Sequence, residues 1–139
     1  MSFKIIGKYI HELNFGIFNP KTFFSLPQNI SNYKINIDIK SNQVKQRIIE
    51  IQTSLKLLPI KDNFEKINTK IIFATIIELT DTANDKNEIE KIILIKVPTE
   101  IYPELRKIFV FVFENSGFKE VKISKNIDFE KLYNLRKTQ

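Results

Sequence analysis

Residues 1–80 alternate between apolar and polar side chains over long stretches, and this pattern restricts the fold more than any other feature of the sequence. In residues 33–40, tyrosine and isoleucine occupy every second position, and charged or amide residues lie between them. Side chains of a β-strand point alternately to the two faces of a sheet, so the pattern predicts strands with one dry and one wet face. Such strands are typical of an antiparallel sheet.

Four stretches show this alternation and are predicted to be strands. They are residues 3–18, 33–39, 47–57 and 66–80. Ser41 and Asn42 supply turn chemistry after the second strand, and Pro59 ends the third because proline cannot donate a hydrogen bond to a ladder. In the first strand we expect His11 on the dry face, as a packed residue rather than a catalytic base, and Glu12 on the wet face.

The join between the first two strands, residues 19–31, is long and contains two prolines and several large apolar side chains. Long loops in compact domains are often functional, and this many apolar side chains need cover from water. The loop therefore either covers the core of its own subunit or borders a binding groove. The sequence leaves both interpretations open.

The pattern becomes helical in the second half of the chain. Apolar residues at helical spacing predict one helix over residues 88–96, which Pro98 should break. A second helix is predicted to begin near Thr99, as its N-cap, and to end at Gly117.

A short last helix is predicted over residues 128–136, with Asp128 as its N-cap. Together these elements predict an α+β fold in a single domain over residues 1–139. It consists of a four-stranded antiparallel sheet, a long helix from the C-terminal half of the chain on one face of that sheet, and the short terminal helix.

The second predicted helix is apolar around its whole circumference in its second half. In a monomer of 139 residues, one face of such a helix should meet water. A helix trapped between two layers of an oligomer explains the pattern best. A strand over residues 109–113 is the alternative, but residues 104–107 before it favour helix. The candidate residues of an oligomer interface are Tyr102, Leu105, Phe109, Val112 and Phe113.

The composition excludes several classes of chemistry. The chain has no cysteine and one histidine, which excludes a disulfide framework, a thiolate or histidine-rich metal site and a cysteine nucleophile. Its three glycines form no phosphate-binding loop. The sequence therefore predicts a non-enzymatic protein without metal or cofactor.

Charge and hydropathy bear on the binding partners and the cellular location of the protein. The net charge is +6 and the pI is about 9.4, but the lysines are scattered among acids rather than gathered in one stripe, so nucleic-acid binding is not favoured. The longest apolar run, residues 108–113, is far shorter than the roughly 20 residues that cross a membrane. We expect a cytoplasmic protein that does not insert into membranes.

Several motifs, in this order and spacing, resemble the SecB family of protein-export chaperones over nearly the whole chain. They are FKIIGKY at 3–9, IHELNF at 10–15, Asn19-Pro20, YPELR at 102–106, Gly117-Phe118 and IDFEKLY at 127–133. The YPELR motif is similar to the family's aromatic-Pro-x-x-Arg signature at the start of its long helix.

The resemblance implies a dimer of dimers in which long helices lie between two eight-stranded sheets. It also implies an ATP-independent holdase that binds unfolded preproteins in extended apolar grooves and passes them to the SecA motor. Promiscuous apolar surface and exposed strand edges suit such binding, and several grooves on one particle add avidity. The groove candidates are Phe15, Phe18, Phe23, Phe24 and Leu26, with core packing as the alternative role. Glu12 is the candidate for motor binding.

The chain departs from the family in its charge. Family members are usually acidic, and an acidic sheet face docks SecA, whereas this chain is basic. Gly16 replaces the second acid of the first strand, and Ile72 and Ala74 replace the Leu-x-Glu pair of the fourth.

The sequence also leaves three other functions open. The chain could be a SecB-like chaperone of a toxin–antitoxin system, bound to an antitoxin. A hot-dog-like enzyme acting on acyl thioesters would also combine a long helix with an antiparallel sheet. A basic nucleic-acid-binding module would show a steep dependence of binding on salt.

Overall fold

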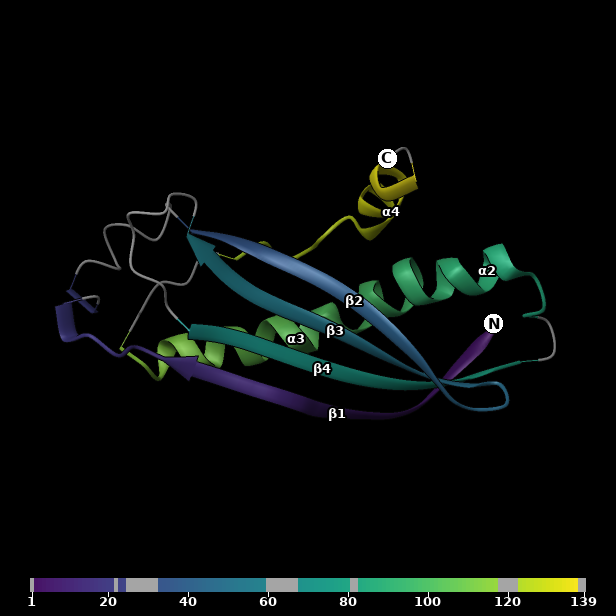
Figure 1. The fold of residues 1–139 in the computed structure, drawn as a ribbon, viewed down its shortest axis with the longest axis horizontal. Coiled ribbons are helices and arrows are strands. Elements are labelled where there is room, and N and C mark those ends of the chain that lie inside the picture. The colour runs from purple at the N-terminus through teal and green to yellow at the C-terminus, as the bar shows by residue number, and fades with distance from the viewer. Residues whose placement is uncertain are drawn as a thin grey trace.

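The computed structural model describes residues 2–21, 23–24, 33–59, 68–80, 83–117 and 123–137. Its strands form one antiparallel sheet with the spatial order β1-β4-β3-β2. The strands are β1 (Phe3–Gly16), β2 (Tyr33–Lys45), β3 (Ile48–Pro59) and β4 (Asn68–Leu79). A long helix runs along one face of this sheet (Figure 1). The predicted α+β fold class is confirmed.

The two faces of the sheet differ in burial. We call the face under the long helix the inner face and the opposite one the outer face. On the inner face, Ile51 lies opposite Thr75 and Leu55 opposite Ile71, and these side chains are buried. The core continues from the first strand to the last helix, with Phe3 and Phe129 in the same apolar cluster.

The hairpin between β2 and β3 is longer than predicted. Ser41 and Asn42 do not form the turn, because both pair with residues of β3. The chain reverses instead at Gln46 and Arg47, where Arg47 has a φ of 64°. The prediction was wrong because turn-forming residues in an edge strand can still pair on one side and meet water on the other.

Strand β1 is an edge strand with two irregularities in its pairing with β4, between Ile5 and Gly7 and between Ile10 and Glu12. Each inserts one residue and so reverses the alternation of side chains after it. His11 is the inserted residue of the second irregularity and is exposed. Its predicted place on the dry face was therefore wrong.

The long helix is continuous where a break was predicted. It consists of α2 (Lys86–Lys91), the π-helical η2 (Ile92–Lys96) and α3 (Val97–Glu114). The Val97 amide donates to the Ile92 carbonyl five residues back. A π-helical turn next to Pro98 lets the helix continue past a residue that lacks an N–H. The predicted break at Pro98 was therefore wrong.

The ends of the helices follow ordinary capping rules with one exception. Thr99 does not cap α3, because its hydroxyl donates to the Ile95 carbonyl at 2.5 Å inside the helix. Asp85 caps α2 by accepting from the Asn87 amide at 3.1 Å. The predicted N-cap Asp128 is confirmed for α4 (Phe129–Lys137), since the Lys131 amide donates to its carboxylate at 3.0 Å.

Candidate functional site

Aromatic side chains gather at the end of the sheet where β1 leaves it. Phe15 is half-buried, and its ring meets that of Phe113 edge-on at a centroid distance of 5.0 Å. Phe18 is 83% exposed and lies over Gly16, where a Cβ would come within 2.7 Å of the Phe18 ring. Because residue 16 is a glycine, this ring can pack against the backbone there.

Two further phenylalanines extend this group toward the end of the long helix. The rings of Phe23 and Phe24 meet edge-on at 5.6 Å. The Phe23 ring lies close to Gly117, which has a φ of 98° and would bring an added Cβ within 2.8 Å of that ring. Phe24 is 76% exposed. Leu26, the fifth groove candidate, lies outside the described residues.

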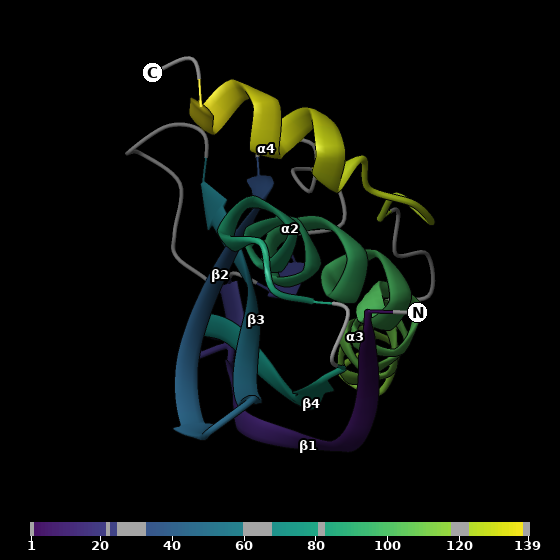
Figure 2. The same cartoon turned by 90° about the vertical axis from the view of Figure 1, so that its right-hand side faces the viewer.

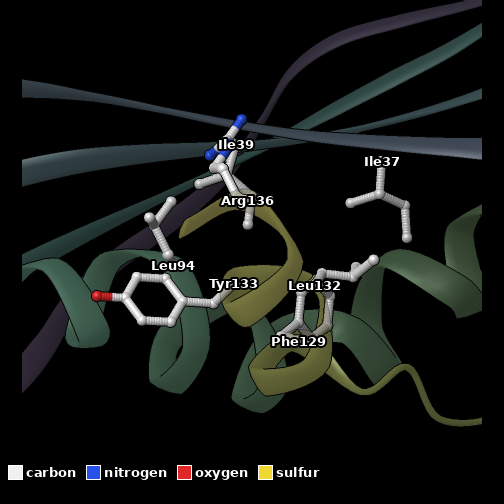
Figure 3. Close-up of a pocket in the computed structure, with 7 residues that line it drawn as sticks. All are labelled: Ile37, Ile39, Leu94, Phe129, Leu132, Tyr133 and Arg136. Carbon is white, nitrogen blue, oxygen red and sulfur yellow. The ribbon is translucent and has the colours of Figure 1, made fainter. Parts of the chain in front are cut away.

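A second apolar site lies beyond the other edge of the sheet. A cavity of about 180 Å³ opens between β2, η2 and α4 (Figure 3). Most of its lining residues are apolar, and Arg136 adds one cation. The lining residues are Ile37, Ile39, Leu94, Phe129, Leu132, Tyr133 and Arg136.

Helix α4 forms one wall of this cavity because its buried stripe anchors it. Phe129 and Tyr133, one turn apart, are buried, and the Phe129 ring meets that of Tyr102 at 6.1 Å. The Tyr102 hydroxyl donates to the Ser124 carbonyl at 2.7 Å, which fixes the segment before α4. Leu132 remains 47% exposed. α4 lies against the helical layer beside η2 (Figure 2).

The sequence prediction missed this cavity. It placed the groove at the first loop, on the strength of its phenylalanines. Ile37 and Ile39 had been assigned to the dry face of a strand, and nothing in the sequence showed that the helix leaves part of that face open. One sequence feature could have indicated the cavity. Leu132 is an apolar residue of α4 that lies outside the buried stripe of Phe129 and Tyr133.

The five candidate residues of the oligomer interface lie at different depths. Four of them are buried within the chain's own core, and Val112 is half-buried. The four buried residues are Tyr102, Leu105, Phe109 and Phe113. The apolar side chain that α3 leaves to the surroundings is Phe111, at 65% exposure. Ile10 and Leu13, which pair with inner-face residues of β4, are each nearly half exposed.

The outer face carries two polar networks. Glu12 accepts from Asn14 at 3.0 Å and lies 3.5 Å from the Lys70 ammonium. Glu50 accepts from Tyr9 at 2.8 Å and from Gln52 at 3.1 Å. The hydrogen bonds that Gln52 and Tyr9 donate lower the pKa of Glu50. The bond between Tyr9 and Glu50 is also the main cause that raises the pKa of Tyr9.

The described part of the chain lacks two kinds of functional feature. None of its His, Asp and Glu side chains gather in threes as a metal site requires. None of its helices is long and apolar enough to cross a membrane.

Comparisons with known proteins identify the family to which this chain belongs. The model of the family described as "Preprotein translocase subunit SecB" matches residues 1–139. A Pelagibacter ubique (strain HTCC1062) protein assigned as a protein-export protein SecB is 38% identical over 97% of this chain and 96% of its own length. Protein-export protein SecB of Rhodospirillum rubrum is 26% identical over 95% of this chain and 80% of its own.

The fold also matches a solved structure. A Mycobacterium tuberculosis SecB-like chaperone, in complex with a ChAD peptide from the HigA1 antitoxin, aligns with a TM-score of 0.58. The alignment covers 88% of this chain and 90% of that chain, at 9% sequence identity, so it shows the shared fold alone. Because the family model spans the whole chain and a relative is more than one-third identical, this protein belongs to the SecB family of protein-export chaperones.

Proposed function

We propose that this chain is an ATP-independent cytoplasmic holdase that keeps preproteins unfolded in its two apolar sites. The observation that carries the proposal is the apolar cavity between β2, η2 and α4, with exposed Leu132 at its rim. An extended client segment would bury alternate side chains there, and no nucleotide chemistry is needed to hold it. This function is that of a chaperone rather than an enzyme, in keeping with the family.

The aromatic group at the other end of the sheet is the second contact in this proposal. Phe18 and Phe24 are the most exposed large apolar side chains of the described residues. Large exposed apolar patches on a soluble protein mark interaction sites. A client long enough to reach both sites would gain avidity, because the second contact becomes intramolecular after the first.

The proposal also includes assembly of several copies of this chain and delivery of the client to the SecA motor. A second copy would cover Phe111, Ile10 and Leu13, in the dimer of dimers that the family resemblance implies. Glu12 remains the candidate contact with the SecA motor, although Lys70 holds its carboxylate.

The test is light scattering of the purified protein with an unfolded, slowly folding client, in the absence of nucleotide. Leu132→Ser should weaken suppression of client aggregation. Leu135→Ser is the matched control, since Leu135 is on the same helix with a similar exposure, 52%, but does not line the cavity. Phe24→Ser tests the aromatic site in the same way. Equal effects of the two leucine changes, or a wild-type protein that ignores the client, would contradict the proposal.

A second candidate function is the protection of an antitoxin. It is favoured by the shared fold with a chaperone bound to an antitoxin peptide. A gene position beside a toxin–antitoxin pair, together with selective binding of that antitoxin's tail over unfolded preproteins, would support it. A position beside translocation genes and broad client binding would support export.

A further inference from the structure

The outer face of the sheet contains a hollow that shares only Ile37 and Arg136 with the cavity proposed to hold clients. Its volume is about 360 Å³, and it lies over β2, β3 and β4 with Arg136 of α4 at one side. Four cations and one carboxylate line it, among amide and hydroxyl side chains. The lining residues are Asn36, Ile37, Asp38, Lys40, Gln52, Ser54, Lys56, Lys70, Ile72 and Arg136. We propose that this hollow docks an acidic, extended polypeptide segment of a partner protein.

The strand register forces two of the cations together. Lys56 lies directly opposite Lys70 in the pairing of β3 with β4. Neighbouring strands are about 4.8 Å apart, and like charges at directly opposed positions are unfavourable. Both lysines are only partly exposed, so water screens them less than it screens a free surface charge. An incoming carboxylate between them would relieve this repulsion.

The carboxylates already present do not neutralise the hollow. Glu12 lies 3.5 Å from Lys70, and Asp38 lies 3.8 Å from Arg136 at an exposed position. Among the residues that the structure describes, no carboxylate lies within 4.0 Å of the ammonium of Lys40 or Lys56. The lining of the hollow thus has an excess of positive charge.

The remaining lining favours a polypeptide over a nucleic acid. Nucleic-acid grooves without sequence preference combine positive charge with aromatic rings on which bases stack. No aromatic ring lines this hollow in the part of the chain described here. The Asn36 amide and the Ser54 hydroxyl oxygen offer hydrogen bonds to peptide groups, and the nearly buried Ile72 also lines the hollow.

The spacing of the cations predicts the spacing of the acidic side chains in the partner segment. Lys40 lies opposite Gln52, which is four residues before Lys56 on β3. At about 3.4 Å per residue, this places Lys40 roughly 14 Å along the strand from the Lys56–Lys70 pair. An extended segment along β3 would meet both groups with acidic side chains on one of its faces. Carboxylates at alternate positions satisfy this requirement.

The test measures binding of a fluorescent peptide of alternating glutamate and serine to the full-length protein by anisotropy. Wild type should bind it in a salt-sensitive way, and should not bind an alternating lysine–serine peptide. The double change Lys40→Glu and Lys56→Glu should weaken binding at least about tenfold. The double change Lys40→Gln and Lys56→Gln should give a smaller loss of binding. This variant keeps the test valid if the charge-reversed variant misfolds, and thermal melting shows whether each variant is folded.

The matched control reverses two exposed lysines elsewhere, Lys86→Glu and Lys91→Glu on α2, and changes net charge by the same amount. An equal loss in this control would overturn the proposal, because binding would then follow net charge alone. Tighter binding of a single-stranded uridine oligonucleotide through the same lysines would also overturn it. Suppression of client aggregation should survive the Lys40 and Lys56 changes, so failure of the docking site is distinguishable from failure of the holdase.

Discussion

The inner and outer faces of the sheet are built from the same strands but have different physical roles. On β4, Ile77 points to the inner face and is fully buried, while its neighbour Ile76 points to the outer face and is half-buried. On β3, buried Thr53 is followed by partly exposed Ser54. The inner face is held by apolar packing against α3, and the outer face by local polar networks.

This difference separates stability from recognition. Changes that remove apolar volume from the inner face should destabilise the fold, because packing there is close. Changes to the outer face can alter charge at little cost in stability, since exposed charges contribute little to it. A chaperone can therefore evolve a new partner on its outer face without rebuilding its core, and the basic hollow of this chain fits that expectation.

The largest expected effect comes from the isoleucine pair on β4. Ile77→Ala should lower the free energy of unfolding by about 3–4 kcal/mol, because it leaves a cavity in a packed core. Ile76→Ala, the same chemical change one residue away, should cost about 1 kcal/mol. Urea denaturation at a fixed protein concentration measures both. Similar losses in the two variants would show that the outer face is also packed, for example by a partner copy.

A smaller effect, of opposite sign on the two faces, is expected on β3. The Thr53 hydroxyl is buried without a hydrogen-bond partner in the described structure, so Thr53→Val should leave stability unchanged or raise it by about 1 kcal/mol. The Ser54 hydroxyl donates to the Asp38 carbonyl at 3.2 Å, so Ser54→Ala should cost about 0.5–1 kcal/mol. The same denaturation experiment compares them. A destabilised Thr53→Val variant would mean that this hydroxyl has a partner.

The subtlest contrast is between two tyrosines whose pKa values are both raised above 10.0. For Tyr102, on the inner side, burial is the main cause, and nearby Arg106 opposes it. For Tyr9, on the outer face, the main cause is its hydrogen bond to Glu50. Glu50→Gln should therefore lower the pKa of Tyr9 toward its ordinary value and leave that of Tyr102 unchanged. Ultraviolet titration of the Tyr9→Phe and Tyr102→Phe variants assigns each transition.

The sign of the linked stability change follows from these directions. A raised tyrosine pKa means that the folded state retains its proton more tightly than the unfolded chain. The stabilisation from Tyr102 is thus complete below pH 10 and is lost as the pH rises through its folded pKa. Tyr102→Phe should remove this part of the alkaline loss. An unchanged alkaline loss in that variant would assign it to other groups.

Alternation and capping were the parts of the structure that local sequence determined well. The alternation of dry and wet faces predicted for the third and fourth strands is confirmed in the described residues of β3 and β4, because each side chain's face depends only on a period of two along a regular strand. Asp128 caps α4 as predicted, since a cap is a contact between residues three apart. The family resemblance was confirmed for a related reason, because its motifs are short local patterns in a fixed order.

Features that depend on distant partners were decided by the tertiary structure. The bulges that expose His11 exist only because β1 pairs with β4, and β2 extends past Ser41 only because β3 offers partners there. The helix crosses Pro98 because its buried stripe packs on the sheet on both sides of that residue, and packing can offset a lost hydrogen bond. The cavity beside α4 and the opposed lysines of the outer face belong to the same class. They arise where elements far apart in sequence meet, so no local period or propensity could encode them.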